Sequence, residues 1–123
     1  GNVAIIPGLV NAHTHLDLSG ARGLIPPTDP NHFTDWLRGV IAYRRSQTAE
    51  GVANDIHNGL EEILQAGTTL VGDIAFAGKS LRYLLKVAMR SVVYFELTGF
   101  SEVRISELSR SLVGSEWGIP VEQ

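Results

Sequence analysis

The chain has 123 residues, 44% of them hydrophobic and 19% charged, and its formal net charge at pH 7 is −3. This length allows one domain with a modest core, and the negative charge argues against nucleic acid or an anionic membrane as a partner. Because cysteine is absent, the sequence excludes disulfides and thiolate metal sites, so a metal would have to be held by histidine and carboxylate side chains.

The first predicted strand starts at Leu9 and runs into His13-Thr14-His15. Alternate side chains of a strand share a face, so both imidazoles point the same way, about 6 to 7 Å apart along the strand. Two neutral imidazoles so placed can hold one divalent ion, and ligand sites in parallel sheets gather at this carboxyl end. The tripeptide alone also fits a strand with one buried, hydrogen-bonded imidazole.

A long irregular connection is expected between Asp17 and Asn31, because its prolines oppose a helix. It either borders a substrate pocket or is a surface linker. Asn31 or Thr34 is expected to cap the helix that follows, and Arg44-Arg45 close it, where cations suit the helix dipole. Its apolar positions recur at helical spacing: Phe33, Trp36, Leu37, Val40 and Ile41.

A second helix is predicted over Ala49–Ala66, with Thr48 as its cap and Gly67 as its left-handed stop. On this helix His57 and Glu61 are expected to form a solvated surface pair. The second strand is predicted at Thr68–Ala75, where Asp73 near the carboxyl end is expected to hydrogen-bond a neighbouring element.

A third helix is predicted from Ser80, with inward positions at Leu81, Leu84, Leu85 and Ala88. The third strand is predicted at Ser91–Thr98, nearly all apolar and therefore covered on both faces. Its single charge, Glu96, needs a partner, which is a structural cation, a metal or a substrate. A fourth helix is predicted at Ser101–Leu112. Strands separated by helices predict parallel pairing and an α/β fold.

Three stretches resemble one family: PGLVNAHTHLDLS at 7–19, GTTLVGD at 67–73 and SVVYFEL at 91–97. They resemble the amidohydrolase superfamily, in its cytosine deaminase-like branch, which includes aminofutalosine, guanine and S-adenosylhomocysteine deaminases and triazine hydrolases. The resemblance implies a (β/α)8 TIM barrel, of which this chain would supply about three parallel strands. Residues 1–123 would then be the N-terminal portion, without the family's preceding β-sandwich and later strands.

The resemblance implies that His13 and His15 are ligands of a divalent metal, Zn²⁺ or Fe²⁺. The metal-activated water attacks an sp2 carbon of a purine-, pyrimidine- or triazine-like small molecule, and the C–N bond at that carbon is cleaved. The further ligands come from the fifth, sixth and eighth strands, and a His-x-x-Glu pair moves protons. None of these is present here, so no catalytic residue is expected within this chain and residues 1–123 alone are expected to be inactive.

The resemblance also marks two substrate-binding candidates. Trp36 belongs to a Trp-Leu pair that lies beside the family's pocket, although core packing explains a tryptophan at that position as well. Glu96 corresponds to a pocket glutamate after the third strand, with a structural salt bridge as its alternative.

Three interpretations follow. In the first, the chain is part of a cytoplasmic amidohydrolase. In the second, it is a small inactive α/β protein derived from the barrel, which self-associates or binds a complementing fragment and so covers its open sheet edges. In the third, it is an unrelated flavodoxin-like domain, which would have a phosphate-binding glycine loop after the first strand, where this sequence has His-Thr-His-Leu-Asp.

Overall fold

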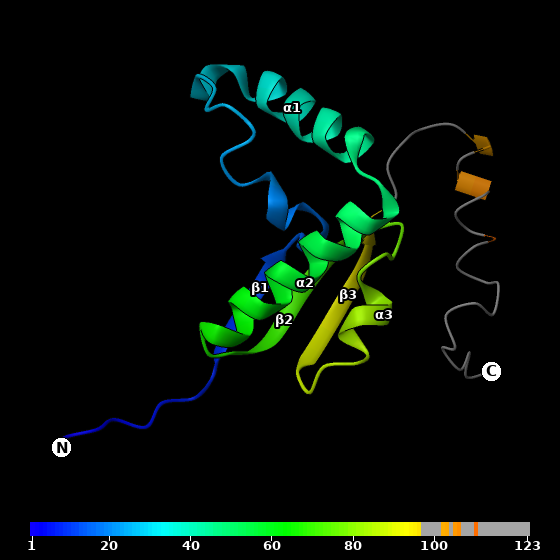
Figure 1. The fold of residues 1–123 in the computed structure, drawn as a ribbon. Coiled ribbons are helices and arrows are strands. Elements are labelled where there is room, and N and C mark those ends of the chain that lie inside the picture. Colours follow the sequence, from blue (N-terminus) through cyan, green and yellow to red (C-terminus); the bar gives the residue numbers. More distant parts are fainter. Residues whose placement is uncertain (97–101, 104, 107–109, 111–123) are drawn as a thin grey trace.

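The computed structural model describes residues 1–96 together with residues 102, 103, 105, 106 and 110. Within them, three strands form one parallel sheet in the order β1-β2-β3. These strands are β1 (Leu9–Thr14), β2 (Thr68–Phe76) and β3 (Arg90–Glu96). The predicted α/β fold with parallel strands is confirmed, and the arrangement is consistent with part of a (β/α)8 barrel (Figure 1).

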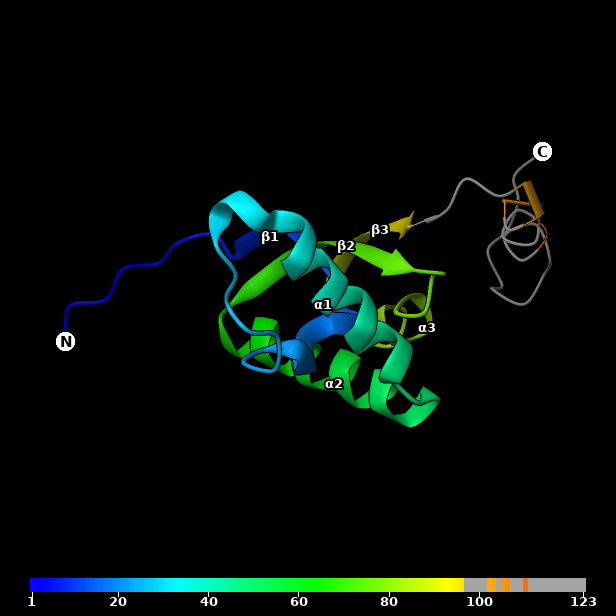
Figure 2. The same ribbon diagram turned by 90° about the horizontal axis from the view of Figure 1, so that it is seen from above.

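Helical segments join the strands. A 3₁₀ helix, η1 (Leu16–Ala21), follows β1, and a shorter one, η2 (Pro30–His32), leads into α1 (Phe33–Ser46). Helix α2 (Ala49–Gln65) precedes β2, and α3 (Leu81–Leu84) lies between β2 and β3. Helices α2 and α3 lie on the same face of the sheet, whereas α1 lies beyond η1, on the side toward which the strands point (Figures 1 and 2).

Helix α2 matches its prediction closely. The Thr48 hydroxyl accepts a hydrogen bond from the Gly51 amide at 3.0 Å, and Gly67 ends the segment with a φ of +79°. The apolar stripe of α2 packs on β2 and η1, and a side chain at Gly59 would clash with Ser19 and Leu16 of η1. The buried cluster consists of Leu16, Ile56, Leu60, Val71 and Leu84.

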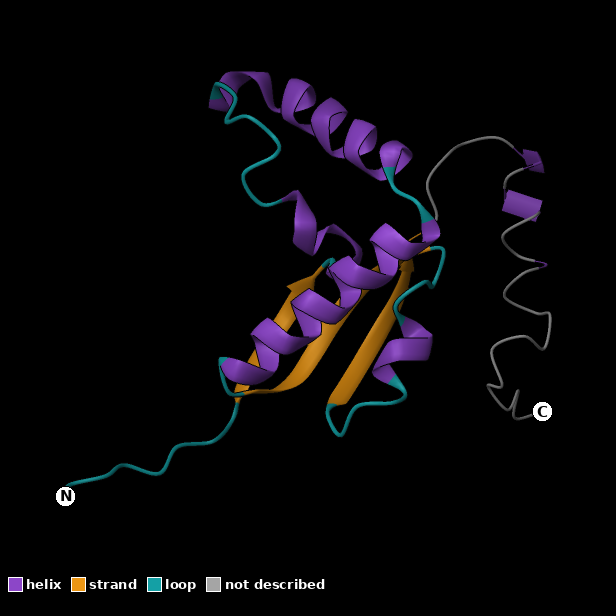
Figure 3. Cartoon of the chain, viewed as in Figure 1, coloured by secondary structure: helices purple, strands orange, loops and turns teal. Residues whose placement is uncertain are grey.

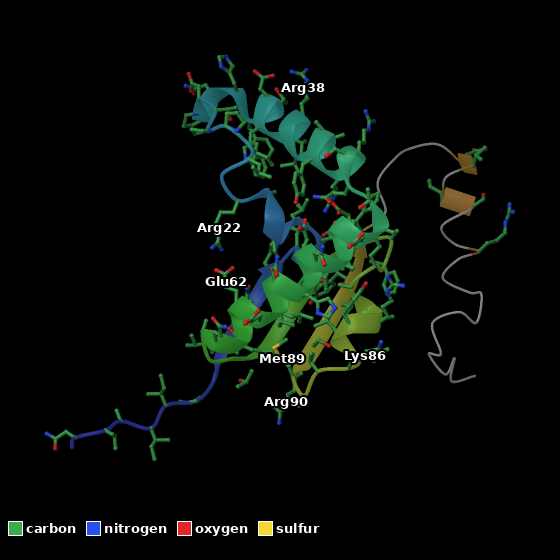
Figure 4. All side chains as sticks on the ribbon, in the orientation of Figure 1. Arg22, Arg38, Glu62, Lys86, Met89 and Arg90 are labelled. Carbon is green, nitrogen blue, oxygen red and sulfur yellow. The ribbon has the colours of Figure 1, made fainter. Side chains whose placement is uncertain are left out.

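An ion pair also joins η1 to α2. The Arg22 guanidinium lies 2.6 Å from a Glu62 carboxylate oxygen, and the two side chains point toward each other in Figure 4. Both side chains are exposed, so solvent screens this pair and it adds little to stability.

The pairing of β1 with β2 is irregular, whereas that of β2 with β3 is continuous from Leu70↔Arg90 to Phe76↔Glu96. One register shift lies between Leu9 and Val10, and a second lies between Asn11 and Thr14. The second shift cancels the first. Thr14 therefore pairs with Asp73 at the same difference in residue number at which Leu9 pairs with Thr68.

Two predictions about the connection after β1 and the helix that follows it were wrong. Residues Leu16–Ala21 form a 3₁₀ helix instead of irregular chain, because the prolines of the connection come only later. Helix α1 begins after His32 without a side-chain cap, while Asp29 caps η2 through the amide of Asn31. Figure 3 shows how this connection departs from the compact region of α2 and the sheet.

The third helix is much shorter than predicted. Helix α3 ends at Leu84, because the amides of Lys86 and Val87 bond to carbonyls three residues back, which unwinds the α-helix. As a result Leu85 and Ala88, which were expected to point inward, are exposed.

Strand β3 is not covered on both faces by the described residues, contrary to prediction. Val92 and Tyr94 are about half exposed, and so are Leu9 and Val10 on β1, the other outer strand. The remainder of the predicted third strand, residues 97–98, and most of the predicted fourth helix lie outside the described residues. In the described part of the chain, no helix combines the length and apolar character needed to span a bilayer.

Candidate functional site

The two histidines of the His-x-His motif lie side by side at the carboxyl end of β1. His13 is exposed on the strand, and His15 follows it with extended dihedral angles (φ −127°, ψ 88°) and is partly buried. Their ring centroids are 5.4 Å apart with the rings edge to face. Although the strand ends at Thr14, the alternation of side chains therefore continues through His15. Metal binding by the pair stays a prediction.

The Nδ1 atom of His15 lies between an acceptor and a donor. It is 3.1 Å from the carbonyl oxygen of Ile74 and 3.4 Å from Nη2 of Arg44. A ring nitrogen either donates or accepts, and a carbonyl only accepts. Because the contact with Ile74 is the shorter one, we assign the proton to Nδ1. The lone pair of Nε2 is then free, as in a histidine that binds a metal through Nε2.

Arg44 places its guanidinium among side chains from the ends of all three strands. Its Nη1 lies 2.8 Å from Oε2 of Glu96, its Nε lies 3.3 Å from Oδ2 of Asp17, and its Cζ lies 4.9 Å from the centre of the Phe76 ring. The two carboxylate contacts are close, but neither is aligned as a hydrogen bond. They are therefore best described as ion pairs.

Asp17 is the most buried carboxylate that contacts Arg44. Its side chain is 4% exposed, and its Oδ1 atom has no hydrogen-bond partner among the described residues. Burial raises the pKa of the Asp17 carboxyl above its ordinary value, and the positive charge of Arg44 opposes that rise. Sequence reasoning missed this ion pair, and its only signal was the position of Asp17 two residues after His15.

Asp73 has a structural role, as predicted. It is fully buried, and its Oδ1 accepts a hydrogen bond from the Leu16 amide at 2.9 Å while its Oδ2 accepts one from the Ser80 hydroxyl. The carboxylate thus fastens the turn after β1 to the end of β2. Since both oxygens are engaged, Asp73 is not available to a ligand in this arrangement.

Comparisons with known proteins confirm the family that the sequence resembles. The sequence model of the Amidohydrolase family matches residues 4–111. The chain belongs to the amidohydrolase family. It is 30% identical over 98 residues to an aminodeoxyfutalosine deaminase of Nitratiruptor sp., an alignment that covers 80% of this chain and 24% of that enzyme.

Other relatives of this amidohydrolase chain carry related names. A 5-methylthioadenosine/S-adenosylhomocysteine deaminase of Haloarcula marismortui is 34% identical over 93 residues, covering 74% of this chain and 21% of the enzyme. A 5'-deoxyadenosine deaminase of Methanococcus maripaludis is 36% identical over 76 residues, an alignment that covers 61% of this chain and 17% of that enzyme. The aligned part of the chain spans about a quarter or less of each of these relatives.

The two substrate-binding candidates occupy different environments in this amidohydrolase chain. Glu96 pairs with Arg44, which is the structural salt bridge named as its alternative role. Trp36 on α1 is 39% exposed and contacts the Phe33 ring at 5.4 Å between centroids, so it is not part of the core. No contact among the described residues joins Trp36 to the two histidines.

The described residues of this amidohydrolase chain bring together only some of the ligands that a metal site needs. Among the described residues, no group of three or more His, Cys, Asp or Glu side chains is placed to hold an ion. Two imidazoles fit half of a site with four ligands, and the free Nε2 of His15 suits that role.

Proposed function

We propose that this chain supplies one side of the active site of a metal-dependent amidohydrolase, a deaminase that cleaves a C–N bond of a purine-, pyrimidine- or triazine-like substrate. The observation that carries the proposal is the His13–His15 pair, with Nδ1 of His15 beside the Ile74 carbonyl, the contact from which we assign the tautomer. The relatives are named for deamination of adenosine derivatives, which favours a purine substrate.

In this proposal, His13 and His15 hold a divalent ion, Zn²⁺ or Fe²⁺. Such an ion supplies Lewis acidity that brings the pKa of water near neutrality. The Ile74 carbonyl fixes the orientation of the His15 ring through Nδ1. Further ligands and the group that protonates the leaving ammonia would come from outside the described residues, and the inactivity of residues 1–123 alone stays a prediction.

Two further residues are proposed to contact the substrate. Glu96 is paired with Arg44, and its carboxylate is placed to make a polar contact with substrate. The exposed Trp36 on α1 offers a flat apolar surface against which a heterocyclic ring can stack. The substrate is then held between α1 and the strand ends.

Metal analysis with matched variants tests the proposal. In an enzyme that contains this chain together with the remaining ligands, we expect about one zinc or iron per chain, and we expect His13→Ala or His15→Ala to abolish that content. The exposed His32 of η2 makes no contact with the pair, so His32→Ala is the control and should retain the metal. Equal metal content in all four proteins would contradict the assignment of the ligands.

Release of ammonia tests the reaction itself. The test substrates are those in the names of the relatives, namely aminodeoxyfutalosine, 5-methylthioadenosine, S-adenosylhomocysteine and 5'-deoxyadenosine, with cytosine and an aminotriazine for the other ring classes. In an enzyme that contains this chain together with the remaining ligands, activity that depends on metal and on His15 is expected with at least one of these substrates. Such an enzyme, loaded with metal, that deaminates none of them would contradict this function.

One observation favours a second candidate, a self-associating or binding module without catalysis. The outer strands expose Leu9, Val10, Val92 and Tyr94, which leaves apolar surface and open strand edges. Sedimentation at micromolar concentration separates the two candidates, because the module predicts a metal-free dimer or larger assembly. A monomer that holds metal would exclude it.

A further inference from the structure

We propose that Arg44 is a positioning residue, which fixes helix α1 across the carboxyl ends of all three strands and thereby sets the wall of the site that α1 presents to substrate. The anchoring of α1 stands on contacts in the structure alone, whereas the effect on substrate rests on the proposed function. No other described side chain joins α1 to the ends of all three strands.

The contacts of Arg44 reach each strand in turn. Asp17 follows β1 in η1, Phe76 is the last residue of β2, and Glu96 is the last residue of β3. The side chain of Arg44 is 16% exposed, so these contacts are screened less than those of surface pairs. Because arginine stays protonated in proteins, the contacts do not depend on its titration.

Helix α1 has little else to hold it. Val40 is its only fully buried residue, whereas Phe33, Trp36, Leu37 and Ile41 are exposed. A hydrogen bond of 2.6 Å from the Tyr43 hydroxyl to Asp55 of α2 is the other polar link to the body of the chain. Both polar links lie near the carboxyl end of α1, so we infer that the helix is tethered at that end.

Lysine cannot replace this arginine. The planar guanidinium contacts two carboxylates with different nitrogens and lies over an aromatic ring, whereas an ammonium is a point charge on a flexible stem. Removing the cation also leaves the buried Asp17 and the partly buried Glu96 without a compensating charge. The anchoring therefore depends on the shape of Arg44 as well as its charge.

Hydrogen exchange resolved by peptide tests the anchoring in the purified protein. In Arg44→Met, we expect amides of residues 33–46 to exchange at least tenfold faster, with residues 49–65 of α2 unchanged. Arg44→Lys should resemble Arg44→Met. The control is Arg45→Met, since the neighbouring arginine is exposed, and it should leave both segments unchanged. Unchanged exchange at 33–46, or an equal rise in Arg45→Met or across α2, would overturn the proposal.

Steady-state kinetics test the effect on substrate. With metal content unchanged, Arg44→Met should raise KM about tenfold and leave kcat within about twofold, because α1 contributes binding that is equal in the ground and transition states. A loss confined to kcat, or an unchanged KM, would overturn the substrate role. If the unsubstituted enzyme that contains this chain together with the remaining ligands deaminates no substrate, the proposed function fails, while the exchange experiment still decides the anchoring.

Discussion

Two helices of this chain are held against the rest of the molecule by different forces. Helix α2 buries an apolar stripe, in which Ile56 and Leu60 pack on Val71 of β2. Helix α1 buries a single residue and is attached through Arg44 and Tyr43, which contact carboxylates. Apolar burial does not depend on direction, whereas these contacts require groups to meet at defined positions.

The two kinds of attachment lie in regions of the molecule with different roles. The α2–β2 layer supplies stability, since fully burying a leucine-sized side chain contributes about 1.5–3 kcal/mol. The carboxyl ends of the strands gather polar groups whose burial costs free energy unless they are paired. The region proposed to bind substrate is therefore the less stable one. Substitutions that separate packing from polar contact test this division.

The largest effect is expected from two adjacent leucines. Leu84 is 2% exposed in the core cluster, whereas Leu85 is 69% exposed. Leu84→Ala should lower the free energy of unfolding by about 3 kcal/mol, because it leaves a cavity, and Leu85→Ala by less than about 0.5 kcal/mol. Urea denaturation measures both. Similar losses in the two variants would show that α3 does not complete the core.

A smaller effect is expected at the buried carboxylate. Asp73→Asn replaces one acceptor oxygen with a donor, so either the Leu16 amide or the Ser80 hydroxyl loses an acceptor. We expect a loss of about 2 kcal/mol in the free energy of unfolding. Asp35 is the control, because it is exposed and pairs only with Arg38 one turn away, so Asp35→Asn should cost less than about 0.5 kcal/mol. Urea denaturation measures the free energy of unfolding of both variants. Equal losses in the two variants would count against a structural role for Asp73.

The smallest effect concerns Tyr43 and is expected to depend on pH. Desolvation, and after it the hydrogen bond to Asp55, raises the pKa of the Tyr43 phenol to about 12. The unfolded chain loses this proton near its ordinary value of about 10, so the stabilisation is complete below that pH and is lost as pH rises toward 12.

Removal of the hydroxyl tests this dependence. Tyr43→Phe should cost about 1 kcal/mol at pH 8 through the lost hydrogen bond. The difference between the two proteins should shrink between pH 10 and 12. Denaturation midpoints at pH 8 and pH 11 give the comparison, and a difference that is constant with pH would exclude the raised pKa of Tyr43.

Features fixed by neighbouring residues could be predicted from the sequence. The periodicity of α2, its Thr48 cap and its Gly67 stop are local, and they were confirmed. The length of α3 was overestimated, because the return of the chain to β3 overrides the helical pattern beyond Leu84. Helix η1 was missed because Asp73, far away in the sequence, holds the Leu16 amide at its start.

The candidate site was predictable to the same extent. The His13–His15 pair follows from strand alternation, and its rings do come together. The surroundings of Arg44 could not be predicted, because Asp17, Phe76 and Glu96 meet only when three strands end at one edge. Sequence reasoning assigned Arg44 to the end of a helix, whereas the contacts that matter cross the sheet.

The paired register shifts of β1 make the length of this strand a constraint in its own right. The first shift moves β1 out of phase with β2, and the second, which spans Ala12 and His13, returns it at Thr14. Removing Ala12 would leave the first shift uncompensated, so Leu9 and Thr14 would no longer meet β2 in the same phase. The number of residues in this strand is therefore a constraint beside the identity of the two histidines.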